Sequence, residues 1–219
     1  MNLNKHLSFF NPASLRKEEI NIIGCGAIGS NVALQLAKLG VEKLVLWDFD
    51  IVSEHNITNQ IYNINDVGRP KVEALEEHLK LQNPTIRIIK KGKYSTQPLK
   101  GILILAVDSI ELRHKIAKQQ EYNIMLRLVI DGRIGLETSQ AYCIDWTKSE
   151  NIENYLKLTD FKDNEVSVPV SPCGTTLSVS PSVQMAVSVM VGCLINYANK
   201  VENPTIIDIH AFRFKITTR

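Results

Sequence analysis

The sequence lacks closely spaced cysteines. Its four cysteines form no C-x-x-C pair and lie far apart, at Cys25, Cys143, Cys173 and Cys193. Neither a zinc site nor a disulfide framework is indicated, so no zinc is expected and any cysteine chemistry would depend on a lone thiol. The five histidines show no metal-ligand spacing either.

The sequence also has little net charge and no long hydrophobic run. A net charge of +2 over 219 residues gives no reason to expect a specific nucleic acid or an anionic membrane as partner. The longest nearly apolar stretch, Val183 to Ile195, is interrupted by Gln184 and Ser188 and is too short to span a bilayer. Residues 1–19 contain no apolar segment of a signal peptide. We therefore expect a soluble, cytoplasmic protein.

Repeats, low-complexity tracts and linkers rich in proline or glycine are absent. With 44% hydrophobic and 22% charged residues, the chain has the balance of a globular domain and can bury a sizeable core. One domain over residues 1–219 is predicted, with an N-terminal segment at 1–19 and a crossover loop at 160–180.

Strand-like and helix-like runs alternate over the first two thirds of the chain. This alternation predicts an α/β fold with a Rossmann-like, doubly wound, mostly parallel sheet, and a two-residue period after Leu136 predicts a C-terminal antiparallel extension. The helix expected at 181–198 is apolar nearly all round, which requires burial in the core or against a second subunit. The expected strands are 20–23, 43–47, 86–89, 101–107, 125–130, 136–146 and 206–216, and the other helices are 32–39, 70–81, 110–120 and 151–158.

A glycine-rich loop lies between the first strand and the first helix, with the sequence Gly24-Cys25-Gly26-Ala27-Ile28-Gly29. Gly24 permits a tight turn, Gly26 lets the backbone approach phosphate, and Gly29 permits close helix packing. The N–H groups at the helix start, from Ala27 onward, favour phosphate binding. Asp48 follows at the spacing of a ribose-binding acid. The alternative is a glycine turn that serves packing alone, and ATP and NAD fit the loop equally well.

Three further motifs distinguish the two nucleotides. In chain order they are Asp48-Phe49-Asp50-Ile51-Val52, Asn56-Ile57-Thr58-Asn59-Gln60 and Gly68-Arg69-Pro70-Lys71-Val72-Glu73-Ala74. They resemble D-x-D-x-V, N-x-x-x-Q and G-x-P-K-V-E-A of the ThiF/MoeB/HesA family, relatives of the ubiquitin-activating enzymes. The resemblance runs from about Ile20 to Asp108 and is that of a short variant without zinc cysteines.

The resemblance implies an ATP- and Mg²⁺-dependent adenylyltransferase. In that family the C-terminal carboxylate of a small β-grasp protein attacks ATP and gives an acyl-adenylate and pyrophosphate, so no general base is needed. The implied partner is a ubiquitin-like or sulfur-carrier protein with a C-terminal Gly-Gly tail, and a homodimer is expected. The rival hypotheses are an NAD-dependent oxidoreductase and a catalytically degenerate subunit that binds nucleotide or only a partner.

The resemblance also implies roles for single residues. Asp48 would hold the ribose, Asn56 would line the nucleotide, Lys71 would neutralise phosphate and Asp108 would hold magnesium. Each has an alternative: Lys71 could be a solvated lysine, although a cation in the first helical turn opposes the helix dipole. Asp108 could be a helix N-cap, with Glu111 completing a capping box, and Asn56 could only start a turn.

The sequence departs from the family at Asn59, where members usually have a phosphate-binding arginine. Arg133 is the candidate replacement, and its alternative is an ion pair with Glu137 or Asp131. Arg113 matches an arginine that the family often has, or else it faces solvent or pairs with Glu111. The family's N-terminal helix is replaced by a short stretch that includes Arg16 and Lys17.

Cys173 is the best candidate for a reactive thiol. It lies in the expected crossover loop, where thioester-forming relatives keep their cysteine, and could accept the acyl group if a nearby cation lowered its pKa. The alternative is a small buried hydrophobic residue. The other three cysteines are assigned to packing, and Asp50 is interpreted as a turn carboxylate that at most supports the site indirectly.

Overall fold

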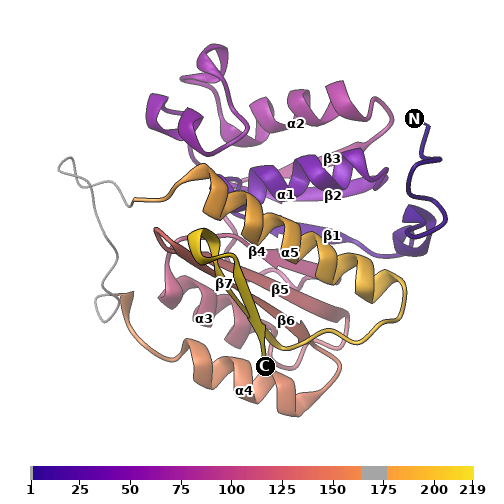
Figure 1. Ribbon diagram of the computed structural model, residues 1–219, viewed down its shortest axis with the longest axis vertical. Coiled ribbons are helices and arrows are strands. Elements are labelled where there is room, and N and C mark those ends of the chain that lie inside the picture. Colours follow the sequence, from indigo (N-terminus) through magenta and orange to yellow (C-terminus); the bar gives the residue numbers. More distant parts are fainter. Residues whose placement is uncertain (1, 164–176) are drawn as a thin grey trace.

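The computed structural model describes residues 2–163 and 177–219 (Figure 1). Its centre is an eight-stranded sheet with the order β3-β2-β1-β4-β5-β6-β7-β8. The strands are β1 Ile20–Ile23, β2 Lys43–Trp47, β3 Arg87–Lys91, β4 Gly101–Leu105, β5 Leu126–Ile134, β6 Thr138–Asp145, β7 Ile206–His210 and β8 Lys215–Thr218. The α-helices are α1 Ala27–Lys38, α2 Lys71–Gln82, α3 Ile110–Gln120, α4 Ser149–Thr159 and α5 Ser180–Ala198.

The first five strands of the chain are parallel and the last three pairings are antiparallel. β1 pairs with both β2 and β4, so the strand order reverses between β1 and β4. From β5 onward each strand pairs antiparallel with the next. The predicted Rossmann-like sheet with an antiparallel C-terminal extension is confirmed, and the reversal point is where such sheets bind ligands.

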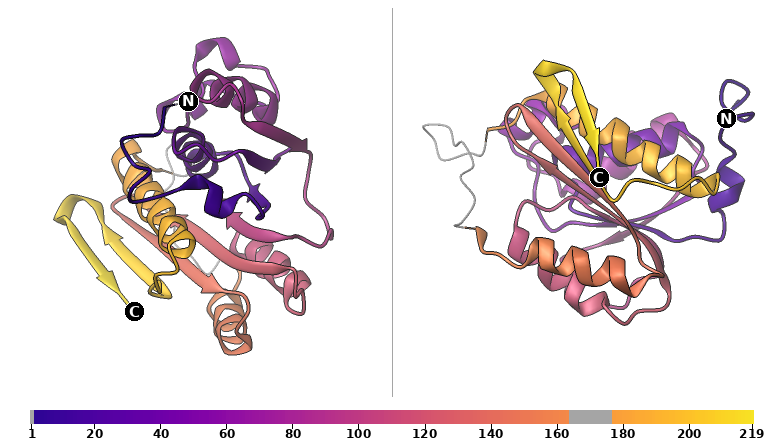
Figure 2. Two further views of the ribbon diagram at one scale, coloured as in Figure 1. Left: turned by 90° about the vertical axis from the view of Figure 1, so that its right-hand side faces the viewer. Right: turned by 60° about the horizontal axis from the view of Figure 1, so that its bottom comes forward.

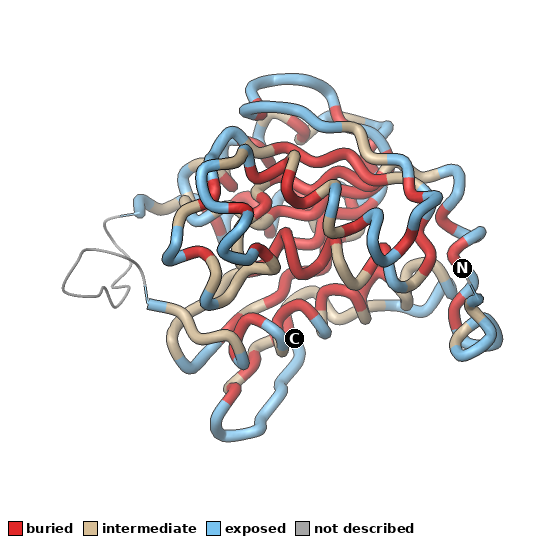
Figure 3. Tube along the Cα trace, turned by 90° about the horizontal axis from the view of Figure 1, so that it is seen from above, coloured by how far each residue is buried: buried red, intermediate tan, exposed pale blue. Residues whose placement is uncertain are grey.

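Helices cover both faces of the sheet and create two cores. α1 and α5 lie on one face, and α3 and α4 lie on the other (Figure 2). The central strands are buried on both sides, as the all-buried run of β4 shows, and buried residues gather along the middle of the molecule (Figure 3). A strand enclosed in this way has no polar face, which explains its uninterrupted apolar sequence.

Several boundaries differ from the prediction. α1 begins at Ala27, before its apolar periodicity starts, and β5 continues to Ile134, so Asp131 and Arg133 are strand residues. The single strand expected at 206–216 is wrong, because the 3-10 turn Ala211–Arg213 separates β7 from β8. Phe214 closes that turn in the left-handed region, with φ of 50°.

α5 is the long apolar helix that the sequence predicted. Its length and composition are those of a helix that could cross a membrane, since an 18-residue window of it has a mean hydropathy of 1.3. The helix is also longer than the apolar stretch Val183 to Ile195 noted in the sequence. Here it is a core helix that packs on α1, β5 and β6. Its exposed residues are Pro181, Gln184 and Ser188, so its apolar side chains find their contacts within the chain.

Candidate functional site

The glycine loop makes a tight turn at the carboxyl end of β1. Gly24 has φ of 91°, and a Cβ there would lie 2.6 Å from the carbonyl oxygen of Ala106. A Cβ on Gly29 would collide with the Gly24 carbonyl, so the start of α1 lies directly against the loop. Gly26 is the N-cap and has no side chain to cap α1, which leaves the first N–H groups of the helix for an anion.

Asp48 and Tyr62 hold this loop in place. The Asp48 carboxylate accepts the Cys25 N–H at 2.6 Å and the Asp50 N–H at 2.8 Å. The buried Tyr62 hydroxyl donates to the Cys25 carbonyl at 2.8 Å. Each Asp48 oxygen keeps capacity for another hydrogen bond, as ribose hydroxyls would require. Tyr62 was not identified from the sequence, where it belongs to none of the motifs.

Lys71 is buried and paired. Its relative exposure is 7%, and its Nζ lies 2.8 Å from Oδ2 of the half-exposed Asp50. The interpretation of Lys71 as a solvated lysine is therefore wrong. Asp50 supplies the negative charge that offsets a lysine at the amino end of α2, so it is more than a turn carboxylate. The D-x-D motif was the signal for this role.

The two asparagines of the second motif make structural contacts. Asn56 is buried, and its Oδ1 accepts the Ser53 N–H at 2.9 Å. Ser53 is the N-cap of the 3-10 turn Glu54–Thr58 and Asn56 is the third residue of that turn, so Asn56 supports the start of the turn without being its first residue. Asn59 donates to the Ser178 hydroxyl at 2.6 Å, and its carbonyl accepts from Asn31 of α1 at 3.0 Å. Asn59 thus connects this segment to α1 and to the residues before α5.

Asp108 lies just beyond β4, exposed at the carboxyl end of the sheet. The N-cap of α3 is Ser109, whose hydroxyl accepts the Leu112 N–H at 3.0 Å. Asp163 supports the same helix end by accepting the Ile110 N–H at 2.6 Å. The alternative interpretation of Asp108 as N-cap is therefore wrong, and capping does not occupy its carboxylate.

A buried ionic cluster lies beside Asp108. Asp131 on β5 has no exposed surface, and it forms ion pairs with Arg113 of α3 and with Arg133, whose Nε is 3.1 Å from Oδ2. The Tyr155 hydroxyl of α4 donates to the same carboxylate at 2.8 Å. Arg113 also donates to the carbonyl of Val107, next to Asp108. Burial lowers the pKa of Arg113 to about 10.

This cluster decides between the alternatives for the two arginines. Arg113 neither faces solvent nor pairs with a glutamate, and Arg133 pairs with Asp131 rather than Glu137. Arg133 also lies over the Tyr142 ring, 4.1 Å from its centroid. Two guanidinium groups share one carboxylate, so the cluster keeps a net positive charge near the strand ends. Tyr155 is a further member that no sequence motif indicated.

The described residues contain no group of three or more His, Cys, Asp and Glu side chains arranged to hold a metal. A nucleotide-bound Mg²⁺ needs only one or two carboxylates besides phosphate and water oxygens, and the exposed Asp108 fits that requirement. Cys173 lies outside the described residues.

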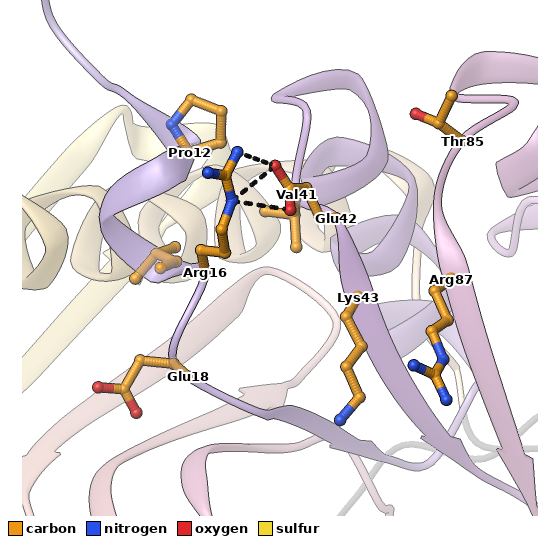
Figure 4. Close-up of a pocket in the computed structure, with 9 residues that line it drawn as sticks. Pro12, Arg16, Glu18, Val41, Glu42, Lys43, Thr85 and Arg87 are labelled. Carbon is orange, nitrogen blue, oxygen red and sulfur yellow. Dashed lines mark hydrogen bonds and ion pairs between the residues drawn. The ribbon is translucent and has the colours of Figure 1, made fainter.

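Two cavities of the fold lie apart from the glycine loop. One of about 530 Å³ is lined by residues that include Arg16, Lys43 and Arg87, and there Arg16 hydrogen-bonds to Glu42 (Figure 4). The other, of about 630 Å³, lies at the amino end of β5. Neither is lined by a residue of the loop, so the candidate nucleotide site is defined by its backbone geometry and by its charged residues.

A glycine-rich βα turn at the reversal point of a parallel sheet, with an acid at the end of the next strand, defines the Rossmann-like nucleotide-binding proteins. Within that class the chain belongs to the ThiF family, whose model matches residues 6–218. The predicted membership of the ThiF family is confirmed.

Curated relatives match parts of the chain. Ubiquitin-like modifier-activating enzyme 5 of Caenorhabditis elegans is 36% identical over 74 residues, which are 34% of this chain and 18% of that protein. The sulfur carrier protein ThiS adenylyltransferase of Escherichia coli is 32% identical over 111 residues, 50% of this chain and 44% of that protein. The matches therefore span less than half of each relative.

Solved structures share the fold. PaaA superposes with a TM-score of 0.72 at 18% identity, over 99% of this chain and 68% of that chain. E. coli MccB with ATP gives 0.70 at 20% identity, over 95% of this chain and 65% of that chain.

Proposed function

We propose that this chain is an ATP-dependent adenylyltransferase that converts a carboxylate into an acyl-adenylate with release of pyrophosphate. The observation that carries the proposal is the buried Lys71, held by Asp50 at the start of α2. A lysine at the positive end of a helix dipole is unfavourable; Asp50 offsets part of that cost, and a bound polyphosphate would offset the rest. NAD binding gives no comparable reason for this lysine.

The reaction needs charge stabilisation and positioning rather than a base. A carboxylate oxygen attacks the α-phosphorus of ATP, and the bond from that phosphorus to the bridging oxygen of pyrophosphate breaks. Free N–H groups at the start of α1 and the Lys71 ammonium stabilise the negative charge on the phosphates. Asp48 orients the ribose, and the cationic cluster around Arg133 replaces the charge missing at Asn59.

Mg²⁺ is part of the proposal. Asp108 is the protein ligand, because its carboxylate is exposed at the strand ends and Ser109 caps the adjacent helix. The ion would neutralise phosphate charge.

The substrate we propose is the C-terminal tail of a ubiquitin-like or sulfur-carrier protein that ends in Gly-Gly. The names of the curated relatives support this class, since one is a ThiS adenylyltransferase and another activates a ubiquitin-like modifier. The alternative is a peptide, because the structural neighbour MccB was crystallised with MccA as well as with ATP. The cytoplasmic location stays a prediction.

ATP–pyrophosphate exchange in the presence of candidate acyl substrates tests the proposal. Lys71→Ala and Asp108→Ala are each expected to lower exchange by about 10²–10³-fold, the usual loss for one charge-stabilising group. Lys80→Ala is the matched control, because Lys80 is a half-exposed lysine of the same helix that pairs with Glu76. Exchange that survives both substitutions, or that Lys80→Ala lowers equally, would contradict the proposed site.

A second candidate is a nucleotide-binding subunit without its own turnover. Asn59 supports this candidate. Its neutral side chain, which donates a hydrogen bond to Ser178, occupies the position where the family usually has a phosphate-binding arginine. ATP binding by calorimetry together with background exchange, followed by activity on adding a second ThiF-family chain, would favour this candidate.

A further inference from the structure

A row of polar side chains crosses the antiparallel part of the sheet. Arg133 on β5 lies opposite Gln140 on β6, and Gln140 lies opposite Asp208 on β7. Residues directly opposite each other in an antiparallel pair share one face of the sheet. Tyr142, two residues after Gln140 on the same strand, belongs to the core cluster on the face that α3 and α4 cover. The row therefore runs along that face, from the ionic cluster around Asp131 towards the edge of the sheet.

Hydrogen bonds join the side chains of this row one to the next. Nε2 of Gln140 donates to Oδ1 of Asp208 at 2.7 Å, and the Tyr142 hydroxyl donates to Oε1 of Gln140 at 3.0 Å. Nη1 of Arg133 donates to the Tyr142 hydroxyl at 3.3 Å. At the outer end of the row, Arg219 donates to the other oxygen of Asp208 at 2.9 Å. A continuous chain of contacts thus reaches Arg133 from three neighbouring strands.

The carboxylate of Asp208 sets the direction of these hydrogen bonds. The bond from Gln140, together with Arg219, holds the pKa of Asp208 below its usual value, so this carboxylate is ionised and only accepts. The Gln140 amide group therefore faces Asp208, and its carbonyl oxygen faces Tyr142. A tyrosine hydroxyl has one proton, and here Gln140 accepts it, so the Tyr142 oxygen offers lone pairs to Arg133. Since arginine only donates, it is the partner that this end of the row fits.

The row fixes the guanidinium group of Arg133 and leaves one of its nitrogens over. Asp131 holds Nε at 3.1 Å, Tyr142 holds Nη1, and the Tyr142 ring lies 4.1 Å from the guanidinium carbon. Nη2 is buried and has no hydrogen-bond partner among the described residues, although the side chain as a whole keeps 14% of its surface exposed. An unpaired buried donor is unfavourable, and an oxyanion of a ligand would satisfy it.

We propose that Gln140, oriented by Asp208, is a positioning residue that acts through Tyr142 to hold Arg133 for a phosphate oxygen of the bound nucleotide. This inference rests on the proposed function, because it takes ATP as the ligand. The role of Gln140 is indirect: it keeps the Tyr142 hydroxyl turned as an acceptor, and that acceptor fixes Arg133 before the nucleotide arrives. Without it, Arg133 would have to be ordered during binding, which costs conformational entropy and lowers affinity.

Calorimetric titration of the whole chain with ATP and Mg²⁺ tests this role. Gln140→Leu, and Tyr142→Phe, which keeps the ring and removes only the hydroxyl, should each raise the Kd for ATP about fivefold, the effect of one net hydrogen bond. Arg133→Met should raise the Kd at least as much. In the Arg133→Met background, Gln140→Leu should change the Kd less than about twofold, because residues that act through one contact are not additive.

A swap of amide and acid provides the rescue. Gln140→Glu places two carboxylates opposite each other and should raise the Kd for ATP. The double variant Gln140→Glu/Asp208→Asn restores a donor facing an acceptor and should return the Kd to within about twofold of wild type. Gln120→Leu is the control, because Gln120 is a buried glutamine that bonds the Leu99 N–H at the other end of β4. It should lower the unfolding temperature and leave the Kd unchanged.

The outcomes separate this inference from the proposed function. A wild type that binds no ATP would overturn both. ATP binding that Gln140→Leu and Tyr142→Phe leave unchanged overturns the inference alone, as does a loss that persists in the Arg133→Met background or a swap that brings no recovery. The expected pattern of Kd values together with background ATP–pyrophosphate exchange would overturn only the proposed adenylyl transfer.

Discussion

At the scale of single residues, buried charge is what distinguishes this site. Asp131 has no exposed surface and forms ion pairs with both Arg113 and Arg133. Lys71 depends in the same way on Asp50. A buried ion is tolerated only when a partner compensates its lost hydration, so each of these carboxylates sets the position of the cation beside it.

Asp131→Asn should therefore destabilise the fold strongly. It leaves two buried guanidinium groups without a counter-charge, and breaking a buried pair in this way costs roughly 3–5 kcal/mol. The free energy of unfolding in urea measures the loss. Asp145→Asn is the control, because Asp145 forms an exposed pair with Lys148 at 3.6 Å and should lose less than about 1 kcal/mol. Equal losses would show that the cluster adds no stability.

At the scale of elements, the segment between β2 and α2 carries two of the diagnostic motifs. It contains the 3-10 turns Glu54–Thr58 and Ile64–Asp66, and backbone bonds between Val52 and Arg69 close it into a loop. Asp66 fastens it to α2 by accepting a hydrogen bond from His78 at 2.6 Å. The position of Asn56 and Asn59 thus depends on a side-chain contact outside both motifs.

This anchor should weaken in acid. Burial alone would raise the pKa of Asp66, but the Asn63 N–H, His78 and Arg69 outweigh it and hold that pKa below its usual value. A depressed carboxyl pKa contributes stability that is present above the unfolded value of about 3.9 and is lost as the pH falls through the folded value. The difference in unfolding free energy between wild type and Asp66→Asn should therefore shrink below about pH 4. A pH-independent difference would contradict this anchor.

A second element, the turn between β7 and β8, presents two exposed aromatic rings. Phe212 and Phe214 are 52% and 87% exposed, and the Ala211 N–H bonds to the Glu137 carbonyl of the neighbouring β5–β6 turn. β5 ends at this edge of the sheet, so the turn lies on the same side as the glycine loop. Exposed aromatic side chains without partners in their own chain are common at polypeptide-binding surfaces.

If the proposed function holds, replacing both rings should impair use of a polypeptide substrate. The double variant Phe212→Ala/Phe214→Ala is expected to raise the KM for that substrate about tenfold, equivalent to about 1.4 kcal/mol, and to leave the KM for ATP unchanged. Phe9→Ala removes a comparably exposed ring, 71% exposed, from the N-terminal segment and should change neither. A rise in the KM for ATP instead would assign the turn to the nucleotide.

At the scale of the whole molecule, the apolar helix α5 forms part of the core of its own chain. α5 packs on α1 and three strands, and its outward residues include the polar Gln184 and Ser188. The apolar character of α5 therefore gives no separate reason for a second subunit. The predicted homodimer rests on the family resemblance and would use another surface.

Light scattering should give a mass twice the 24.6 kDa of the chain. Ser188→Arg, on the exposed side of α5, should leave that mass unchanged because the apolar side chains of the helix face inward. A monomeric wild type would disprove the homodimer, and a variant that dissociates would place the interface on α5.

The sequence by itself determined the parallel sheet, the glycine loop with Asp48, and the family. These depend on local patterns, namely apolar periodicity, glycines that the backbone requires, and motifs in a fixed order. The pattern located strand and helix ends less accurately. β5 is longer than predicted, because the charged Asp131 and Arg133 interrupt its apolar run while pairing with β6 keeps them in the strand.

Only the tertiary structure decided which side chains meet. Asp50 with Lys71, Asp131 with two arginines, and Tyr62 with the glycine loop all join separate elements. No periodicity records such contacts, because they depend on how strands register and how helices pack over them. The same packing decided that Ser109 caps α3 and that the carboxylate of Asp108 stays exposed at the edge where a nucleotide would bind.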